Sequence, residues 1–295
     1  MATSVGAQAV AIAASLANER LVVNSWHGSR SQPPSARGLI DLTATESRSF
    51  LEDLDFEYRP AEGGLQGRLT LNDEMMAPGS TQAAIAVLAS IADVMTGIPV
   101  SSRAERIDGF TVGLTVDLAL RTFAPLRVGN YDVRSTVLKH GRTVSVTEAV
   151  VTGAGGTALA HCLATFMPTT LPGNAKVRIS PNRVGGGSLS APFAEALGIQ
   201  VDDDGVSTVE RRPYTLQPAG TIQGGVVCAL VEAAAQRALG SPIDELDVRF
   251  LATVRSGPGR ATPSVIAPGT ARVTVVDAGA DPGRPTAIAL ARVTR

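Results

Sequence analysis

Two long, almost uncharged segments with matching surroundings constrain the fold of this 295-residue chain more than any other feature. The first spans Thr81–Thr96 (TQAAIAVLASIADVMT) and the second spans Ile222–Leu239 (IQGGVVCALVEAAAQRAL). Both are apolar on nearly every side, so each predicts a helix that the rest of the protein must enclose. Each also carries one acidic residue in its middle, Asp93 in the first and Glu232 in the second. An acid in such apolar surroundings is unusual and singles out both positions.

The segments on either side of these helices repeat as well. Phe50–Tyr58 (FLEDLDFEY) is similar to Phe193–Val201 (FAEALGIQV), and each predicts a short helix that runs into a strand. An acidic, glycine-containing turn follows each segment and predicts a hairpin. After each long helix come four alternating or β-branched segments that predict strands: Phe110–Leu120, Tyr131–Lys139, Thr143–Thr152 and Thr157–Phe166 in the first half, and Leu246–Ala252, Arg260–Ile266, Thr270–Val276 and Thr286–Val293 in the second.

This repeat predicts two domains of the same kind in tandem. One apolar helix followed by consecutive antiparallel strands indicates a sheet curled around that helix, once in residues 46–170 and once in residues 189–295. Residues 171–188 between them are rich in Pro, Gly, Asn and Ser and predict a linker. Residues 1–45 have no counterpart in the repeat, and we expect an extension that is disordered or partly helical, with Ala7–Asn18 as its candidate helix. The fold class is therefore α+β.

Composition argues against several classes of protein. Hydrophobic residues make up 44% of the chain, which is ample for a core. A net charge of −1, from 26 basic and 27 acidic residues, lacks the basic surplus that nucleic-acid binding needs. Cys162 and Cys228 lie far apart without a CxxC motif, and there are three histidines, so we expect neither a disulfide framework nor a metal site. The two cysteines are expected to be small buried side chains.

The chain also lacks the usual signs of a membrane or secreted protein. No apolar stretch approaches the roughly 18 residues that a membrane span needs. Met1–Leu21 is rich in alanine but has no basic residue before Arg20, whereas a secretory signal begins with positive charge. We therefore expect a soluble, cytoplasmic protein with neither a membrane nor a nucleic acid as partner.

The start of the second helix has the groups needed to bind a carbonyl oxygen. Residues 217–225 are QPAGTIQGG, which places Gly224 and Gly225 in the first turn, where glycine costs helix stability. A helix start offers free N–H groups and a partial positive charge, and glycine leaves these groups unobstructed. Such a site can polarise a carbonyl and hold a developing oxyanion. Close packing of another backbone is the alternative explanation for the two glycines.

Neither acid can act at the start of its own helix. Glu232 lies nine residues after Gln223, which is about 13.5 Å along the helix axis and about 180° around it. The same geometry holds for Asp93. A catalytic role for either acid therefore requires the facing helix of the other repeat. The alternative is an acid that is simply hydrogen-bonded or exposed at a helix edge.

At these residues the sequence resembles the hot-dog fold acyl-CoA thioesterases of the phenylacetyl-CoA (PaaI-like) branch, and especially the actinobacterial double hot-dog proteins. The family pattern is Asn-x-x-Gly-x-x-His-Gly-Gly with an acid nine residues after the His. The second half matches it with Gln217, Gly220, Gln223, Gly224, Gly225 and Glu232. The segments ASIADVMTG and TVDLALRTFAPLRVG support the resemblance in the first half. The resemblance implies two hot-dog domains that pair as a pseudo-dimer within one chain.

The resemblance also implies a reaction, the hydrolysis of acyl-CoA thioesters at sites between the two halves. The N–H of Gly225 would polarise the thioester carbonyl, and an acid from the other half would serve as general base or nucleophile. The stronger composite site combines Asp93 with Gln223, Gly224 and Gly225. Further implications are acyl-CoA as the ligand, no cofactor, no metal, and a homo-oligomer, either a dimer or a trimer of the two-repeat chain.

Two departures from the family pattern lie at the start of the second helix. Gln223 replaces the family His, and its amide can donate a hydrogen bond but cannot titrate. Gln217 replaces the family Asn and is retained as a candidate substrate-binding residue. Glu232 is retained as a candidate catalytic residue.

The start of the first helix has no glycine pair. Counting nine residues back from Asp93 gives Ala84–Ala86 as the counterpart of the glycine pair, whereas aligning Gly79 with Gly220 gives Gln82–Ala84. We use the count from the carboxylate, because the helix between the two positions must stay in phase. We therefore expect one competent site at Asp93 and one degenerate site at Glu232.

Other candidate residues concern the substrate. The acyl chain is expected between the two helices, against Ile85, Leu88 and Val226, although plain core packing explains each of them as well. The CoA end needs cations at the rim of the site, for which Arg142 and Arg127 are candidates. Ordinary solvated loop arginines are the alternative explanation for this pair. Burial would raise the pKa of a catalytic acid, which suits a general base near neutral pH.

Two further functions are open alternatives. A non-catalytic protein that binds acyl-CoA is favoured by the missing His and Asn. A hydratase on the same fold pairs an Asp with a His shortly after it, and no Asp of this chain has such a His. Motifs of other enzyme classes, such as GxSxG, the P-loop or GxGxxG after a strand, are absent from the sequence.

Overall fold

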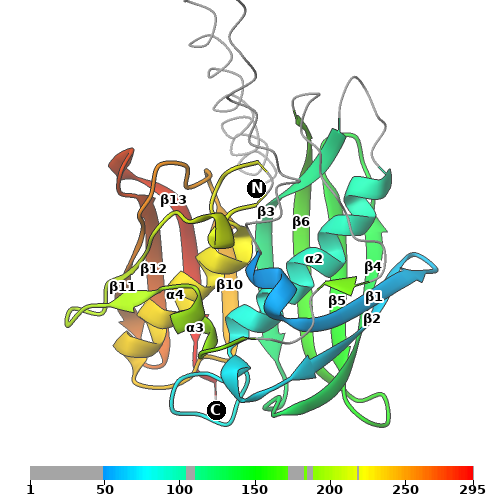
Figure 1. The fold of residues 1–295 in the computed structure, drawn as a ribbon, viewed down its shortest axis with the longest axis horizontal. Helices are drawn as coiled ribbons and strands as arrows, with labels where there is room; N and C mark the ends of the chain where they lie inside the picture. The colour runs from blue at the N-terminus through cyan, green and yellow to red at the C-terminus, as the bar shows by residue number, and fades with distance from the viewer. Residues whose placement is uncertain (1–48, 104–109, 172–182, 185–188, 218, 295) are drawn as a thin grey trace, which may run out of the picture. The chain divides into compact units, whose positions relative to one another are not determined.

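Each half folds around one long helix, as the repeat predicts (Figure 1). The computed structural model describes residues 49–103, 110–171, 183–184, 189–217 and 219–294, and the helix expected at Ala7–Asn18 lies outside them. The two long helices, α2 (Ile85–Arg103) and α4 (Gly224–Leu239), contact each other on one face of a single sheet (Figure 1).

The order of the elements repeats in the two halves. The first half contains η1 (Phe50–Asp53), β1 (Asp55–Ala61), β2 (Gly64–Leu71), η2 (Asp73–Met75), α2, β3 (Phe110–Thr122), β4 (Gly129–Lys139), β5 (Ser145–Thr152) and β6 (Ala158–Leu171). The second contains α3 (Phe193–Ala196), β8 (Gln200–Val201), β9 (Ser207–Val209), η3 (Pro213–Thr215), α4, β10 (Glu245–Phe250), β11 (Gly259–Ala267), β12 (Thr270–Asp277) and β13 (Asp281–Arg292). All eight strands predicted after the long helices are confirmed.

The strand order is mirrored about the middle of the sheet. Within the described residues, 13 antiparallel strands follow the order β7-β1-β2-β4-β5-β6-β3-β10-β13-β12-β11-β9-β8. Strands β3 and β10 join the halves, with Leu118 opposite Val248 at the junction. The two helices therefore lie on a shared sheet, in the pseudo-dimeric arrangement that the fold prediction implies.

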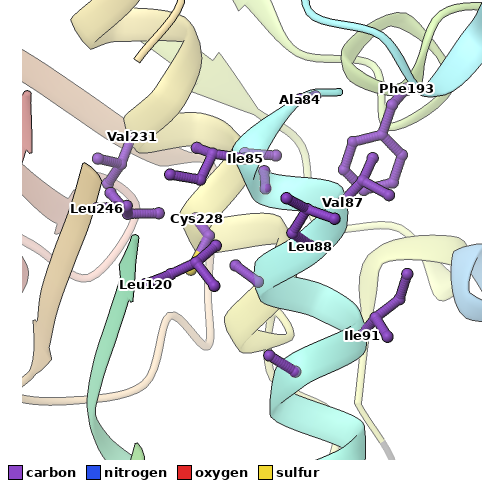
Figure 2. Close-up of a cluster of buried hydrophobic side chains, with 14 of the residues drawn as sticks. Ala84, Ile85, Val87, Leu88, Ile91, Leu120, Phe193, Cys228, Val231 and Leu246 are labelled. Atoms are coloured by element: carbon purple, nitrogen blue, oxygen red, sulfur yellow. The ribbon is translucent and has the colours of Figure 1, made fainter. Parts of the chain in front are cut away.

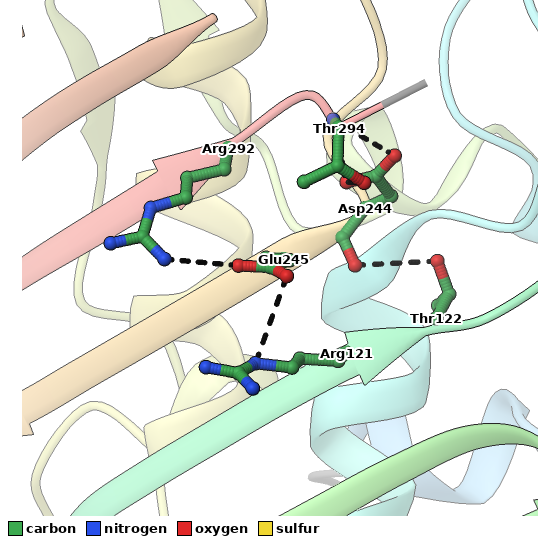
Figure 3. A network of polar contacts seen from close by, with 6 residues as sticks. All are labelled: Arg121, Thr122, Asp244, Glu245, Arg292 and Thr294. Carbon is green, nitrogen blue, oxygen red and sulfur yellow. Dashed lines mark hydrogen bonds and ion pairs between the residues drawn. The ribbon is translucent and has the colours of Figure 1, made fainter. Parts of the chain in front are cut away.

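Backbone pairing sets the register of this junction (Figure 3). The N–H of Thr122 donates to the carbonyl of Asp244 at 2.9 Å. The hydroxyl of Thr122 donates to the same carbonyl at 3.3 Å, and Figure 3 draws this second bond. Glu245 lies between two arginines, 3.7 Å from Arg121 Nε and 3.1 Å from Arg292 Nη1. Because these side chains are substantially exposed, the ion pairs contribute little to the stability of the junction.

A shared apolar core lies between the helices and the sheet (Figure 2). Leu88 of α2, Cys228 of α4, and Leu120 and Leu246 of the two joining strands belong to one buried cluster. These side chains are at most 1% exposed, so neither half could keep this core dry without the other. Cys162 is buried as well, and both cysteines are free, which confirms their expected role as small buried side chains.

The bounds of the first helix differ from the prediction at both ends. Helix α2 begins at Ile85 instead of Thr81, because Thr81 and Gln82 form a bend and the backbone of Ala83 forms a bridge with Met76. It also continues past Thr96 to Arg103, through Pro99. Proline removes one helical N–H donor, yet the helix continues for another turn.

Two smaller findings complete the fold. Strand β7 (Arg183–Val184) pairs with β1, so part of the predicted linker belongs to the sheet. Among the described residues, no helix is both long and apolar enough to cross a membrane.

Candidate active site

Asp93 of α2 faces the first turn of α4. Its Oδ2 lies 3.4 Å from the point where a Cβ atom on Gly224 would stand, and the ring of Phe250 lies 3.7 Å from the same point. The hydroxyl of Thr115 donates to Asp93 Oδ1 at 2.6 Å. Four elements from both halves, α2, β3, α4 and β10, therefore converge on one carboxylate.

The first turn of α4 presents donors that the protein leaves unused. Gln223 precedes the helix in an extended conformation, with φ −73° and ψ 149°, and its side chain does not cap the helix. Its carbonyl accepts from the N–H groups of Val226 and Val227 at 3.0 and 3.1 Å. No acceptor among the described residues takes a hydrogen bond from the N–H of Gly224 or Gly225. An acid and two free donors therefore lie at the same helix start.

Different structural features account for glycine at positions 224 and 225. A Cβ atom on Gly225 would stand 2.2 Å from Ser90 Oγ and 2.8 Å from Ser90 Cβ, so the close approach of α2 requires glycine there. A Cβ atom on Gly224 would make only ordinary contacts, with Asp93 as its closest neighbour. Backbone packing thus explains Gly225, whereas Gly224 leaves space directly in front of Asp93.

Burial makes Asp93 a stronger base than an ordinary aspartate. The residue is partly exposed, but its carboxyl group is enclosed between the two helices and β3. Burial raises the pKa of Asp93 from 3.8 to about 6, and the hydrogen bond from Thr115 acts in the opposite direction. Asp93 is thus ionised at neutral pH and holds a proton more readily than a solvated carboxylate does.

Glu232 of α4 lies at the start of α2, where both of its carboxylate oxygens accept hydrogen bonds. Its Oε1 accepts from the N–H of Ile85 at 2.9 Å and its Oε2 accepts from the N–H of Ala86 at 3.0 Å. Gln236 donates a third hydrogen bond to Oε1 at 2.9 Å. Burial raises the pKa of Glu232 to about 7, although both backbone N–H groups lower it.

The structure decides between the two possible registers of the first helix. The N–H of Ala84 donates to the carbonyl of Met75, just as the N–H of Gln223 donates to the carbonyl of Thr215. Ala84 is therefore the counterpart of Gln223, in agreement with the count from Asp93. The other register is wrong because the loop that follows the left-handed glycine is two residues longer in the first half.

The two candidate glutamines have different surroundings. Gln217 donates its side-chain N–H to the Thr221 hydroxyl in its own loop, and its backbone N–H to the carbonyl of the same residue. The structure therefore directs Gln217 into its loop and not toward Asp93. Gln223 is buried beside Gly224, and its Oε1 has no hydrogen-bond partner among the described residues.

The apolar candidates lie deep in the core. Ile85, Leu88 and Val226 are 0%, 1% and 0% exposed. All three belong to the buried cluster that the two halves share, and Figure 2 labels Ile85 and Leu88 within it. Contact with an acyl chain stays a prediction for all three.

The two candidate arginines lie in different loops of the first half. Arg142 is exposed in the β4–β5 turn, and strand pairing places this turn at the same end of the sheet as Thr115, because Thr115 pairs with Phe166 and Phe166 pairs with Ser145. Arg127 donates to the hydroxyl of Thr81 at 2.6 Å, in the loop before α2. It helps to line an open pocket of about 430 Å³ together with Asp73, Met76, Ser80, Thr81 and Val128.

Sequence reasoning missed Thr115 and Phe250. Thr115 lies in the middle of β3 and Phe250 at the end of β10, and neither belongs to a local motif. Thr115 reaches Asp93 within the first half, and Phe250 lies near Gly224 within the second. The contact between α2 and α4 then brings the two pairs together. The sequence offered one signal for Thr115, a hydroxyl side chain in the first strand after the helix, and none for Phe250.

Comparisons with known proteins give structural neighbours but no sequence family. No protein-family model matches the chain, and no curated protein matches its sequence. A candidate thioesterase II from Thermobifida fusca YX matches with a TM-score of 0.51 and 17% identity, over 84% of this chain and 98% of the other.

Two further neighbours act on acyl carrier protein thioesters, according to their names. An acyl-ACP thioesterase from Bacteroides thetaiotaomicron matches with a TM-score of 0.54 and 11% identity, over 77% of this chain and 96% of the other. A 12:0-ACP thioesterase from Umbellularia californica matches with a TM-score of 0.54 and 12% identity, over 77% and 92% of the two chains. At such low identity the likeness shows the fold and not the activity. The chain therefore has a double hot-dog fold, with thioesterases among its structural neighbours.

Proposed function

We propose that this protein hydrolyses acyl thioesters, and acyl-CoA in particular, in the site between Asp93 and the start of α4. One observation carries the proposal: a carboxylate with a raised pKa lies beside a helix start whose first two N–H groups are unused. This pairing of a base with oxyanion donors is what acyl transfer to water requires. The thioesterases among the structural neighbours support the same chemistry.

The proposed reaction uses water as the nucleophile. Asp93 accepts a proton from water while the water oxygen bonds to the thioester carbonyl carbon. The resulting oxyanion accepts hydrogen bonds from the N–H groups of Gly224 and Gly225, which the dipole of α4 strengthens. The carbon–sulfur bond then breaks, and the thiol leaves with the proton that Asp93 held.

The remaining features of the site concern the substrate. Arg142 is proposed to bind a phosphate of CoA, and the position of its turn at the Thr115 end of the sheet supports this role. Acyl carrier protein thioesters, on which two structural neighbours act by name, are the alternative substrate. The cytoplasmic location and the dimeric or trimeric assembly stay predictions.

A protein that binds acyl-CoA without hydrolysing it is the second candidate function. Gln223 favours it, because an amide at this position cannot exchange a proton with the substrate. Gln217 favours it too, since its side chain is held by Thr221 and does not reach toward Asp93.

Thiol release from a panel of substrates separates the two functions. Wild type is compared with Asp93→Ala on short-chain, medium-chain, long-chain and phenylacyl CoA, and on the matching carrier-protein thioesters. We expect hydrolysis by wild type that is lost in the variant. If no thioester is hydrolysed but acyl-CoA still raises the melting temperature, the result supports acyl-CoA binding and rejects hydrolysis.

Thr115 is expected to set the pH at which the site works. Thr115→Val removes the hydrogen bond that lowers the pKa of Asp93. Because the base must be ionised, the acid limb of the kcat/KM profile, expected near pH 6 in wild type, should move up by about one unit. Thr115→Ser keeps the hydroxyl and should keep the wild-type profile. An unshifted profile in the valine variant would show that Asp93 is not the titrating base.

A further inference from the structure

The two acids occupy equivalent places in the repeat, yet they act on the facing helix in different ways. Asp93 and Glu232 are separated by 139 positions, and so are Ile85 and Gly224, the first residues of the two helices. Each acid therefore faces the helix start of the other half. The two places differ in the length of the acid and in the residues at the facing helix start.

Glu232 binds the start of α2 in the way that an anion would. Each carboxylate oxygen accepts from one backbone N–H, at 2.9 Å for Ile85 and 3.0 Å for Ala86. Helix starts are anion-binding sites for this reason. Glu232 is 5% exposed and takes a third hydrogen bond from Gln236, so the group is dry and satisfied. The position that a substrate oxygen would need at this helix start is therefore filled.

Asp93 leaves the corresponding position at α4 open. Its side chain is shorter by one methylene, about 1.5 Å, and Thr115 of β3 holds one of its oxygens. Gly224 and Gly225 keep their N–H groups unused among the described residues, and Gly224 adds no side chain between them and the acid. A shorter acid held by a strand hydroxyl thus gives an open site, whereas a longer acid closes the other one.

We propose that Glu232 is the built-in occupant of the second site, so that each chain has one open thioester site and one site closed by its own carboxylate. Glu232 is then not a general base but an internal anion that joins α4 to the start of α2. The part of this proposal that concerns substrate rests on the proposed function, and the part that concerns the bound carboxylate does not.

Rescue by free carboxylates tests the bound anion. Glu232→Ala removes the carboxylate and leaves two buried N–H groups without an acceptor, so we expect the melting temperature to fall by about 5–10 °C. Formate and acetate should restore part of this loss in Glu232→Ala, but sodium chloride of equal ionic strength should not. Asp93→Ala, the equivalent variant in the other half, should show no such rescue, and Glu232→Gln should show none because the amide still fills the space.

The proposal is overturned if Glu232→Ala melts like wild type, or if the carboxylates raise the melting temperature of every variant equally.

Binding stoichiometry tests the single open site in wild type, and it does not depend on whether Glu232→Ala folds. Titration calorimetry with a non-hydrolysable alkyl-CoA thioether should give one molecule bound per chain. Two molecules per chain would mean that Glu232 does not close the second site. If no thioether binds while acetate still rescues Glu232→Ala, the proposed function fails and the role of Glu232 stands.

Discussion

Asp93→Asn is expected to abolish most hydrolysis while making the protein more stable at neutral and alkaline pH. The substitution keeps the size of the side chain and an acceptor for the Thr115 hydroxyl. It removes the group that takes the proton from water, and loss of a general base costs about 100-fold to 10,000-fold in rate. Thiol release under saturating substrate measures this loss.

The gain in stability follows from the direction of the pKa shift. Folding raises the pKa of Asp93 from 3.8 to about 6, so the folded state favours the protonated form. The stability that Asp93 contributes is complete below about pH 4 and is lost as pH rises through about 6. At pH 8 the ionised wild type is therefore less stable than the neutral asparagine variant, by about 2–3 kcal/mol.

Denaturant unfolding at pH 4 and at pH 8 measures this difference. The two proteins should be close in stability at pH 4 and should differ at pH 8. Asp203→Asn, a change at an exposed loop carboxylate, is the control and should leave both stability and hydrolysis unchanged. A variant that is less stable than wild type at pH 8 would show that Asp93 is not destabilised by burial.

Gly225→Ala is expected to have the largest effect on packing. The new methyl group would stand 2.2 Å from Ser90 Oγ and 3.1 Å from Ser90 Cα, so α2 and α4 must move apart. Overpacking of this kind costs about 1–3 kcal/mol. Hydrolysis should fall as well, because the movement separates Asp93 from the start of α4. Thermal unfolding and thiol release measure the two effects.

Gly224→Ala is the matched control for this prediction. Its methyl group would meet Asp93 Oδ2 at 3.4 Å and would clash with no backbone atom. Stability should be kept or slightly raised, since alanine favours a helix, whereas hydrolysis should fall because the methyl group stands in the space before Asp93. Ser90→Gly combined with Gly225→Ala should regain part of the lost stability. Equal melting temperatures for Gly225→Ala and wild type would contradict the close approach of the two helices.

The sequence predicted the repeating parts of the fold well. Apolar periodicity and turn residues are local signals, so they indicated both helices, all eight strands after them and the pairing of two similar halves. The bounds of α2 were less well predicted. A bridge from Ala83 to Met76 precedes its start, and a hydrogen bond from the Gly113 N–H to the Ser101 hydroxyl ties the turn beyond Pro99 to β3. Strand β7 was missed because its two residues depend on an edge of β1 for their pairing.

The sequence alone identifies the groups that the protein offers for chemistry. Helix geometry required each acid to serve the opposite helix, and the unusual glycine pair indicated the start of α4. What Asp93 and Glu232 do there was decided only by the tertiary structure, because hydrogen bonds depend on distances across the two halves. Thr115 draws the shorter acid to β3 and leaves two donors free, whereas the longer acid reaches Ile85 and Ala86 and fills their helix start. The sequence shows the difference of one methylene between the two acids, but the hydrogen bonds that make one proposed site open and the other closed form only in the folded chain.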